Sequence, residues 1–387
     1  MRHVYLDYNA TTPIHPLVSG FLKGLLDGGF YGNPSSAHAT GREARSLLDE
    51  AREHVAALIK CHPDEIVFNG GGTEGDNHAI KGLAYARSDD GGHIITTVVE
   101  HPAVLNTCRY LEGKGFRVTY LPVDEQGVVD PDDVKRAIRG DTTLISVMLA
   151  NNETGTLMPI REIGSMAREY GILLHSDMVQ ALGKIKIDVN DMNVDLASFS
   201  GHKMYTPKGV GAFFMRRGVE IDNLIHGAHQ EGGRRPGTEG TIGIAAFGKA
   251  CQTMGQEMDE TGQRVERLRS RLFDGIQRKI DGTHLFGHPD RRLPNTIFMG
   301  FEDVESESLL IGLDMEGISV SSGAACSSGV VEPSHVLLAM GIPLSFCRGA
   351  IRMSLGRETT EEDINYVLDV LPTVVSRLRQ TPRNNGA

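Results

Sequence analysis

Short apolar runs recur between about residues 65 and 215, and longer segments of mixed polarity separate them. The runs are EIVF, HIITTVV, RVTYLPV, TLISVMLA, ILLHSD, LASFS and GAFFMRR. Apolar runs of this length, bounded by Gly, Asn and Asp, are typical of strands that are buried on both faces of a mostly parallel sheet. The pattern therefore predicts an α/β domain built on a mostly parallel sheet, with helices between the strands.

A different pattern begins near Gln256. From there to Ile280, apolar residues recur at helical spacing among charges, which predicts an amphipathic helix that joins two lobes. Further on, NTIFMGF and AIRMSLG predict strands and ESLLIGLDMEG predicts a helix. A terminal helix should start at Thr359 or Thr360, because either hydroxyl can cap the acidic first turn that follows.

Polar clusters follow five of the predicted strands. They read NGGGTEGDN, EHPAV, NNETG, DMVQ and SGHK. The carboxyl ends of parallel strands meet at one edge of a sheet, where α/β proteins place their ligands. The clusters therefore predict one shared site.

The cluster NGGGTEGDN, from Asn69 to Asn77, lies between a strand and a helix. A glycine run at this point lets the backbone approach a phosphate, and the helix N-terminus offers N–H donors to it. The segment has neither the Lys-Ser/Thr of a P-loop nor the spacing of a dinucleotide fingerprint. A plain strand-to-helix turn is the alternative interpretation.

Two charged residues at strand ends suggest cofactor chemistry. Lys203, in SGHKMYTPKG, is placed to form a Schiff base with an aldehyde cofactor that carries a phosphate. Asp177, which ends ILLHSD, is the acid that would face the pyridine nitrogen of such a cofactor. The alternatives are a surface lysine and a helix N-cap.

Two further residues fit the same site. His101 follows a strand and can stack on a planar ring or move protons, although a hydrogen-bonded core histidine is the alternative. Arg352 lies inside an apolar strand, where an unpaired guanidinium would be costly, so it needs an anion. A substrate carboxylate and an internal salt bridge are both open.

Composition narrows the class of protein. The 387 residues carry a net charge of −11 without long runs of either sign, which argues against nucleic-acid and membrane surfaces. The five cysteines are odd in number, scattered and without a CxxC pair, so we expect a reducing compartment, no disulfide scaffold and no metal site. The N-terminus lacks a signal pattern, and we expect a cytoplasmic protein.

One cysteine has unusual neighbours. Cys326 lies in SSGAACSSG, where every other residue is Ser, Gly or Ala. So little apolar surface predicts a mobile loop, because burial offsets little of the chain entropy lost on ordering. A harmless surface cysteine is the alternative to a working thiol.

Taken together, these stretches resemble the NifS/IscS cysteine desulfurases, in the first group of that family. These are pyridoxal-phosphate enzymes of fold type I within the class-V aminotransferases. The resemblance spans nearly the whole chain through the motifs VYLDYNATTP, YGNPSSAH, EHPAV, NNETG, SGHKMYTPKG, RRPGT, SSGAACSSG and IRMSLGR. It implies a large domain, residues 15–256, with a seven-stranded mostly parallel sheet, and a smaller α+β domain formed by residues 1–14 and 257–387. The small domain would carry the cysteine loop at about 321–332.

The resemblance also implies roles for individual residues. Lys203 would form the Schiff base and move the substrate's α-proton, Asp177 would pair with the pyridinium nitrogen, and His101 would stack on the ring. The residues expected to complete the cofactor site are Gly72, Thr73, Asn152, Gln180, Ser200 and His202, joined by Thr238 from a second subunit. Arg352, with Asn152, would bind the substrate carboxylate. At Met178 the family usually has an alanine beneath the ring, so the resemblance places this side chain there.

Under this resemblance the activity would be conversion of L-cysteine to L-alanine, with the sulfur passing to Cys326 as a persulfide. An external acceptor, such as an iron–sulfur scaffold protein, would then take the sulfur from a homodimer. A selenocysteine lyase and a class-V aminotransferase share Lys203 and Asp177, although a transaminase needs no thiol. A non-catalytic sulfur carrier of the same fold is a further alternative.

Overall fold

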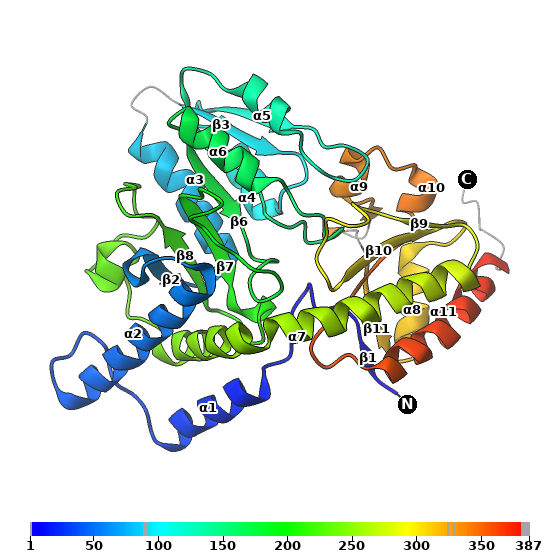
Figure 1. Cartoon of the computed structure of the whole chain (residues 1–387), viewed down its shortest axis with the longest axis horizontal. Coiled ribbons are helices and arrows are strands. Elements are labelled where there is room, and N and C mark those ends of the chain that lie inside the picture. Colours follow the sequence, from blue (N-terminus) through cyan, green and yellow to red (C-terminus); the bar gives the residue numbers. More distant parts are fainter. Residues whose placement is uncertain (1, 88–91, 323–324, 328–329, 381–387) are drawn as a thin grey trace.

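The computed structural model describes residues 2–87, 92–322, 325–327 and 330–380, and leaves the side chains of residues 323–332 undescribed. Figure 1 shows two sheets side by side, with the long helix α7 running beneath both. The larger sheet lies within the first part of the chain and the smaller one within the last part. Each sheet with its helices is called a lobe below, the first with the larger sheet and the second with the smaller one.

The larger sheet has seven strands in the order β2-β8-β7-β6-β5-β3-β4. Their bounds are β2 Ile66–Asn69, β3 His93–Thr97, β4 Arg117–Leu121, β5 Thr142–Ser146, β6 Leu173–Asp177, β7 Leu196–Ser200 and β8 Gly211–Met215. Only β8 runs antiparallel to its two neighbours. Each strand overlaps one of the seven apolar runs and extends at most one residue beyond it, so the predicted α/β fold with a mostly parallel sheet is confirmed.

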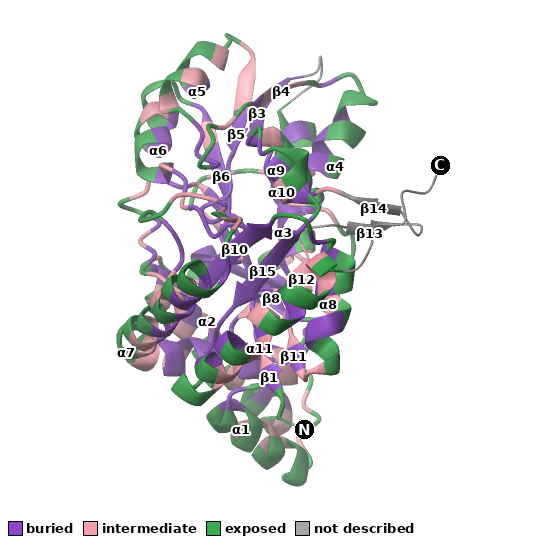
Figure 2. Ribbon diagram, turned by 90° about the vertical axis from the view of Figure 1, so that its right-hand side faces the viewer, coloured by how far each residue is buried: buried purple, intermediate pink, exposed green. Residues whose placement is uncertain are grey.

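Alternate residues along each strand enter different clusters. Ile66 and Phe68 of β2 contact the main core, which includes α2 (Ala39–Ile59) and α6 (Ile160–Glu169). Val67, between them, joins a cluster on the opposite face that includes a residue of α3 (Gly72–Ala86). Helix α4 (Pro102–Glu112) packs beside α3, and Figure 2 shows the sheet buried between exposed helical surfaces. Burial on both faces explains the continuous apolar runs.

The smaller sheet is antiparallel and has the order β12-β15-β10-β9. Its strands are β12 Ser321–Ser322, β15 Ala350–Ser354, β10 Thr296–Phe301 and β9 Thr283–Leu285. Helices α8 (Ser306–Met315) and α11 (Glu361–Gln380) pack together against a core that this sheet shares. The predicted strands NTIFMGF and AIRMSLG are thus β10 and β15.

Shorter elements complete the described chain. Two parallel strands, β1 (Val4–Tyr5) and β11 (Ile318–Ser319), join the N-terminal segment to the second lobe. The short helices are α1 Pro16–Asp27, α5 Pro131–Ala137, α9 His335–Ala339 and α10 Leu344–Cys347. The 3-10 turns are Pro63–Glu65, Gly201–Lys203 and Gln230–Gly233. Strands β13 (Ala325–Ser327) and β14 (Val330–Glu332) pair within the predicted cysteine loop.

The joining helix starts earlier than its pattern predicts. Helix α7 spans Thr241–Lys279, whereas the charges and apolar residues alternate at helical spacing only from Gln256. Its first half is buried on most sides, with Phe247 and Cys251 in the main core, so it shows no amphipathic pattern. The proposed domain boundary at residues 256 and 257 falls inside this helix, and the division into two domains stays a prediction.

The terminal helix begins as predicted. The Asp363 N–H donates to Thr360 Oγ1 at 3.1 Å, and the Thr360 N–H donates to Asp363 Oδ2 at 3.0 Å. This reciprocal pair satisfies two N–H groups that the first turn of a helix cannot use internally.

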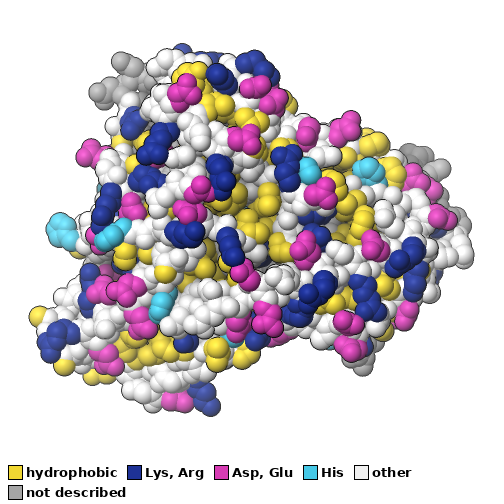
Figure 3. All heavy atoms as spheres, viewed as in Figure 1, with side chains coloured by type: hydrophobic (Ala, Val, Ile, Leu, Met, Phe, Trp, Pro, Cys, Tyr) yellow, Lys and Arg dark blue, Asp and Glu magenta, His cyan; other side chains and the backbone are white. Residues whose placement is uncertain are grey.

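The surface drawn in Figure 3 carries basic and acidic side chains interspersed. None of the helices in the described part of the chain is both long enough and apolar enough to span a bilayer.

The closest approach of α2 and α7 depends on a glycine. A Cβ on Gly248 would lie 2.3 Å from Ala51 Cα, so Gly248→Ala must push the two helices apart. We predict that this change lowers the free energy of unfolding by about 1–3 kcal/mol in chemical denaturation. Gly255→Ala in the same helix meets only Leu58 Cδ1 at 4.0 Å and should raise stability by about 0.5–1 kcal/mol. Equal effects at the two positions would contradict this packing.

Candidate active site

A cavity of about 640 Å³ opens at the carboxyl ends of the parallel strands. All of the predicted site residues except Thr238 and Cys326 line it, namely Gly72, Thr73, His101, Asn152, Asp177, Gln180, Ser200, His202, Lys203 and Arg352. Arg352 comes from β15 of the smaller sheet, so the cavity lies between the two lobes. The expectation that separate strand-end clusters build one site is met.

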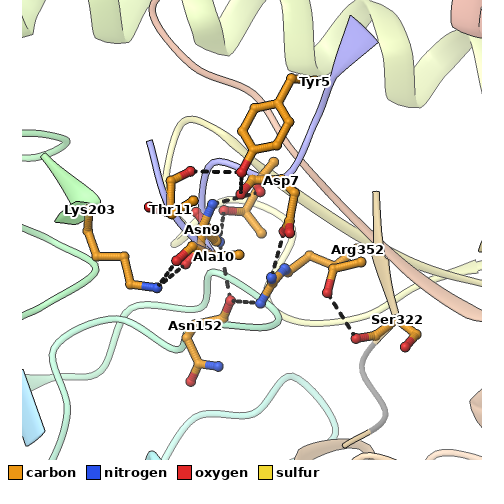
Figure 4. Close-up of polar contacts among 12 residues, drawn as sticks. Tyr5, Asp7, Asn9, Ala10, Thr11, Asn152, Lys203, Ser322 and Arg352 are labelled. Carbon is orange, nitrogen blue, oxygen red and sulfur yellow. Dashed lines mark hydrogen bonds and ion pairs between the residues drawn. The ribbon is translucent and has the colours of Figure 1, made fainter. Parts of the chain in front are cut away.

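The Lys203 amine is held by the N-terminal segment. Lys203 ends the 3-10 turn that follows β7, and its Nζ donates to the backbone carbonyls of Asn9 and Ala10, at 2.6 Å each (Figure 4). Burial lowers the Lys203 pKa to about 8, with a further lowering from the positive Arg352. Asp7 and Asp177 act in the opposite direction. An amine that loses its proton near neutral pH can serve as a nucleophile and a base.

Asp177 lies at the end of β6 and is 7% exposed. Its Oδ1 accepts the Val179 N–H at 2.9 Å. Burial raises the Asp177 pKa, while His101, the Val179 N–H and Lys203 oppose the rise by favouring the carboxylate. A cation in the cavity would therefore favour the ionised form of this buried carboxyl group.

His101 forms the N-cap of α4, where its Nδ1 accepts the Ala103 N–H at 3.1 Å. Burial lowers the His101 pKa, and Lys203 adds to this, although Asp177 opposes it. The imidazole is therefore neutral at neutral pH, and its ring faces the cavity. The imidazole is hydrogen-bonded, as the core-histidine alternative expects, and the residue also lines the cavity.

A second acid lies beside these groups. Asp76 of α3 is 1% exposed and lines the cavity. Ligand-type atoms of Asp76, His101 and Asp177 all lie within 4.8 Å of one another, and Asp76 Oδ1 has no hydrogen-bond partner among the described residues. Burial raises the Asp76 pKa well above its usual range, and the charge on Asp177 raises it further.

The start of α3 is built to receive an anion. No side chain of the described residues caps this helix at Gly71, so its first N–H groups remain available beside the cavity. Gly71 has a φ of 140°, which side chains disfavour, and a Cβ on Gly72 would lie 2.5 Å from Val179 Cγ2. Ser200 and His202 line the cavity with these glycines, which supports the anion-binding interpretation over a plain turn.

The residue after Asp177 is not where the resemblance places it. Met178 is fully buried in the main core, and Val179 lines the cavity instead. Successive side chains after a strand point to opposite sides, so a shift of one residue decides which of them faces the ligand. The expectation that Met178 lies beneath a ring is wrong.

Gln180 and Asn152 are held in fixed orientations. Gln180 Nε2 donates to the Asn9 carbonyl at 3.0 Å, and its Oε1 accepts from Lys184 Nζ at 2.7 Å. The Asn152 carbonyl accepts from Arg352 Nη1 at 3.0 Å and from Asn9 Nδ2 at 3.2 Å. These bonds hold the Asn152 backbone, and the residue lines the cavity.

Arg352 has an acidic partner as well as a place at the cavity. Its Nη2 donates to Asp7 Oδ1 at 2.9 Å, as Figure 4 shows. The salt bridge left open by the sequence is therefore present, and the guanidinium still lines the cavity.

Reasoning from the sequence gave no individual role to six residues of the site, namely Asp7, Asn9, Ala10, Asp76, Val179 and Lys184. Asp76 and Val179 do lie in the clusters NGGGTEGDN and DMVQ, which predicted the site as a whole. VYLDYNATTP contributed only to the family resemblance, although it holds three of them. The available hint was the acid Asp7 and the amide Asn9, which follow the short strand β1. Nothing in the neighbouring sequence indicates what these two side chains contact.

Thr238 does not line the cavity, and the position of the Cys326 side chain lies outside the described residues. Thr238 is exposed, on a loop that Arg235 fixes near α3 through Glu74, with Arg235 Nε 2.8 Å from Glu74 Oε1. The residues on either side of Thr238 line a second hollow of about 510 Å³, which shares Gly70 with the first. Cys326 lies on β13, but its side chain is outside the described residues, and so is the test of the predicted mobile loop.

The other four cysteines are free thiols. Cys108, Cys251 and Cys347 are buried and Cys61 is half-buried. Burial raises the pKa of all four, to about 12 for Cys61 and Cys108. Thiols in this state are poor nucleophiles, which supports their expected structural role.

Comparison with known proteins places this geometry in a family. The aminotransferase class-V family matches residues 4–367. A cysteine desulfurase IscS of Dictyoglomus turgidum is 50% identical over 378 residues, which cover 98% of this chain and 96% of that relative. A cysteine desulfurase IscS of Methanosarcina thermophila is 49% identical over 379 residues, with 98% and 93% covered. A solved structure titled NifS-like protein has a TM-score of 0.91 at 38% identity, covering 97% of this chain and 100% of that one.

The lowered pKa of Lys203 is open to direct test. In cofactor-free protein, we predict that Lys203 reacts with an aldehyde with a midpoint near pH 8, because the amine reacts only without its proton. Arg352→Gln removes a positive neighbour and should move this midpoint upward. Rates measured against pH, with Lys203→Ala as the background of other lysines, check both. A midpoint near the ordinary value of 10.5, or a downward shift, would contradict it.

Proposed function

The chain belongs to the class-V aminotransferase family and, within it, to the cysteine desulfurases, and we propose that it converts L-cysteine to L-alanine with pyridoxal phosphate bound in the cavity between the lobes. The observation that carries this proposal is the convergence of Lys203, Asp177, His101 and Arg352 on that one cavity.

The residues present fit this cofactor. The uncapped start of α3, from Gly72 and Thr73, suits its phosphate, with Ser200 and His202 beside it. Asp177 suits a protonated ring nitrogen, because a cation favours its carboxylate form against the effect of burial. When bound, the cofactor withdraws electrons from the amino acid, which makes the Cα proton acidic and the Cβ–Sγ bond breakable.

Each side chain then has a defined task. Lys203 receives the Cα proton at Nζ and returns a proton later, for which a pKa of about 8 is suitable. His101, neutral and facing the cavity, stacks on the ring and assists proton transfer. Gln180, whose Oε1 accepts from Lys184, would hydrogen-bond near the phenolic oxygen of the bound ring through its amide N–H. Arg352 and Asn152 hold the substrate carboxylate.

Cys326 is the proposed sulfur acceptor. The Cys326 thiolate attacks Sγ of L-cysteine, an S–S bond forms, and the Cβ–Sγ bond breaks. The carbon that loses sulfur gains a proton, so L-cysteine and the thiol give L-alanine and a persulfide with no other reactant. The raised pKa of the four other thiols supports the assignment to Cys326.

We also propose the setting in which the protein acts. A homodimer would let Thr238 reach the partner's cofactor phosphate, and a separate acceptor protein, such as an iron–sulfur scaffold, would take the persulfide sulfur. Free, scattered cysteines support a reducing, cytoplasmic compartment.

Cys326→Ala tests the sulfur acceptor. Incubated with L-cysteine without a reductant, the wild-type protein should gain one sulfur on Cys326, located by peptide mass spectrometry, and release an equal amount of alanine. The variant should bind cofactor normally and lose alanine formation by at least about a hundredfold, because the attacking group is gone. Cys61→Ala is the matched control, since the Cys61 thiol has a raised pKa. Sulfur transfer at the wild-type rate in Cys326→Ala would exclude this role.

Thr238→Ala tests the shared site. This variant should bind pyridoxal phosphate about tenfold more weakly, because one hydrogen bond to a charged group is lost. When it is mixed with Lys203→Ala protein to form hybrid dimers, one site per dimer should regain normal affinity and activity. That site combines an intact Lys203 with Thr238 from the other subunit. If Thr238 acted within its own subunit, the one site of the hybrid that keeps Lys203 would retain the weakened cofactor affinity of Thr238→Ala.

A further inference from the structure

Arg352 is a buried cation that is only partly satisfied. The residue is 8% exposed and lies on β15, in the middle of the smaller sheet. Nη2 donates to Asp7 and Nη1 donates to the Asn152 carbonyl, yet Nε has no partner among the described residues. A buried donor without a partner costs free energy, so the guanidinium is ready for a further acceptor from the cavity.

Asp7 is held in place by its own segment rather than by Arg352 alone. The Asp7 backbone forms a bridge with Ser354, two residues beyond Arg352 on β15. The Tyr5 hydroxyl donates to the backbone carbonyls of Asp7 and Thr11, at 3.0 Å each, which ties the turn together (Figure 4). The Asp7 carboxylate is therefore a fixed charge at the guanidinium, and Asp7 is not among the described residues that line the cavity.

The charges at this point limit what the cavity can hold. Arg352 and Asp7 together carry no net charge, so one bound carboxylate leaves the group at −1. A ligand with two carboxylates would leave it at −2 in a partly buried setting, where like charges repel far more than in water. Lys203 and Lys208 also line the cavity and carry positive charge, so this repulsion concerns the Arg352 end of the cavity, where the Asp7 carboxylate lies 2.9 Å from the guanidinium.

We propose that Asp7 is a specificity-determining positioning residue, which holds Arg352 in place and weakens its attraction for anions so that the site accepts amino acids with one carboxylate and rejects dicarboxylates such as aspartate and glutamate. This inference rests on the proposed role of Arg352 as the carboxylate-binding group. It deepens that role, because the ion pair explains how a small thiol amino acid is separated from acidic ones.

Asp7→Asn isolates the charge, because the amide oxygen can still accept from Arg352 Nη2. Binding of propionate and of succinate to the holoprotein is measured by calorimetry at fixed ionic strength. Neither ligand has an amino group, so no turnover occurs. We expect both to bind more tightly in Asp7→Asn, and the preference for propionate over succinate to fall by at least about fivefold, since the second carboxylate loses the larger repulsion.

Three variants serve as controls. Asp363→Asn neutralises an exposed Asp–Arg pair of the same 2.9 Å length, between Asp363 and Arg2, and should leave both affinities unchanged. Asp7→Glu keeps the charge and should keep the wild-type preference. Asp7→Ser is a second neutral variant, used if thermal unfolding shows that Asp7→Asn does not fold.

The outcomes separate the inference from its premise. An unchanged preference in the neutral variants, or the same change in Asp7→Glu, would overturn the role of the Asp7 charge while leaving Arg352 as the clamp. If Arg352→Gln binds propionate as tightly as the wild type does, the clamp itself fails and the proposed function must be revised. Loss of propionate binding in Arg352→Gln together with the altered preference in Asp7→Asn supports both.

Discussion

The site depends on which groups accept hydrogen bonds from the buried amine of Lys203. Lys203 follows a strand of the larger sheet, and no acid of the described residues forms a salt bridge with it. Its Nζ instead donates to the carbonyls of Asn9 and Ala10, which come from the other end of the chain. A buried ammonium without a carboxylate partner is held less firmly in its charged form, which is why burial lowers its pKa to about 8. The N-terminal segment therefore fixes the position of this amine, while burial and the nearby Arg352 lower its pKa.

Asn9 also connects the Lys203 site to the second lobe through hydrogen bonds. Its Nδ2 donates to Thr296 Oγ1 at 2.9 Å, and its backbone N–H donates to Ser354 Oγ at 2.9 Å, both on the smaller sheet. Its Oδ1 accepts from Lys184 and Asn295. One fully hydrogen-bonded residue thus joins the lobe that carries Lys203 to the lobe that carries the substrate-binding arginine. The distance between base and carboxylate clamp is set by this junction, not by the sequence between them.

The parts that were predictable from sequence are those with local causes. A strand buried on both faces must be continuously apolar, and its carboxyl end must carry the functional groups, so the sheet and residues such as Asp177 and Lys203 could be identified. Asp7 and Asn9 could not, because their partners lie more than a hundred residues away. The side facing the cavity after Asp177 depends on a one-residue register, which propensity does not encode.

Three buried carboxyl groups lie near the cavity, namely Asp76, Glu100 and Asp177. Their surroundings do not favour a negative charge on all three at once. Glu100 accepts the Met148 N–H and the Thr97 hydroxyl, yet burial raises its pKa to about 8, so it keeps its proton at neutral pH. Burial and the charge on Asp177 raise the Asp76 pKa as well. Of the three, only Asp177 is favoured as an anion by the positive charge of Lys203. A negative charge in this part of the cavity is therefore most favourable on Asp177, the carboxylate that we propose faces the ring nitrogen.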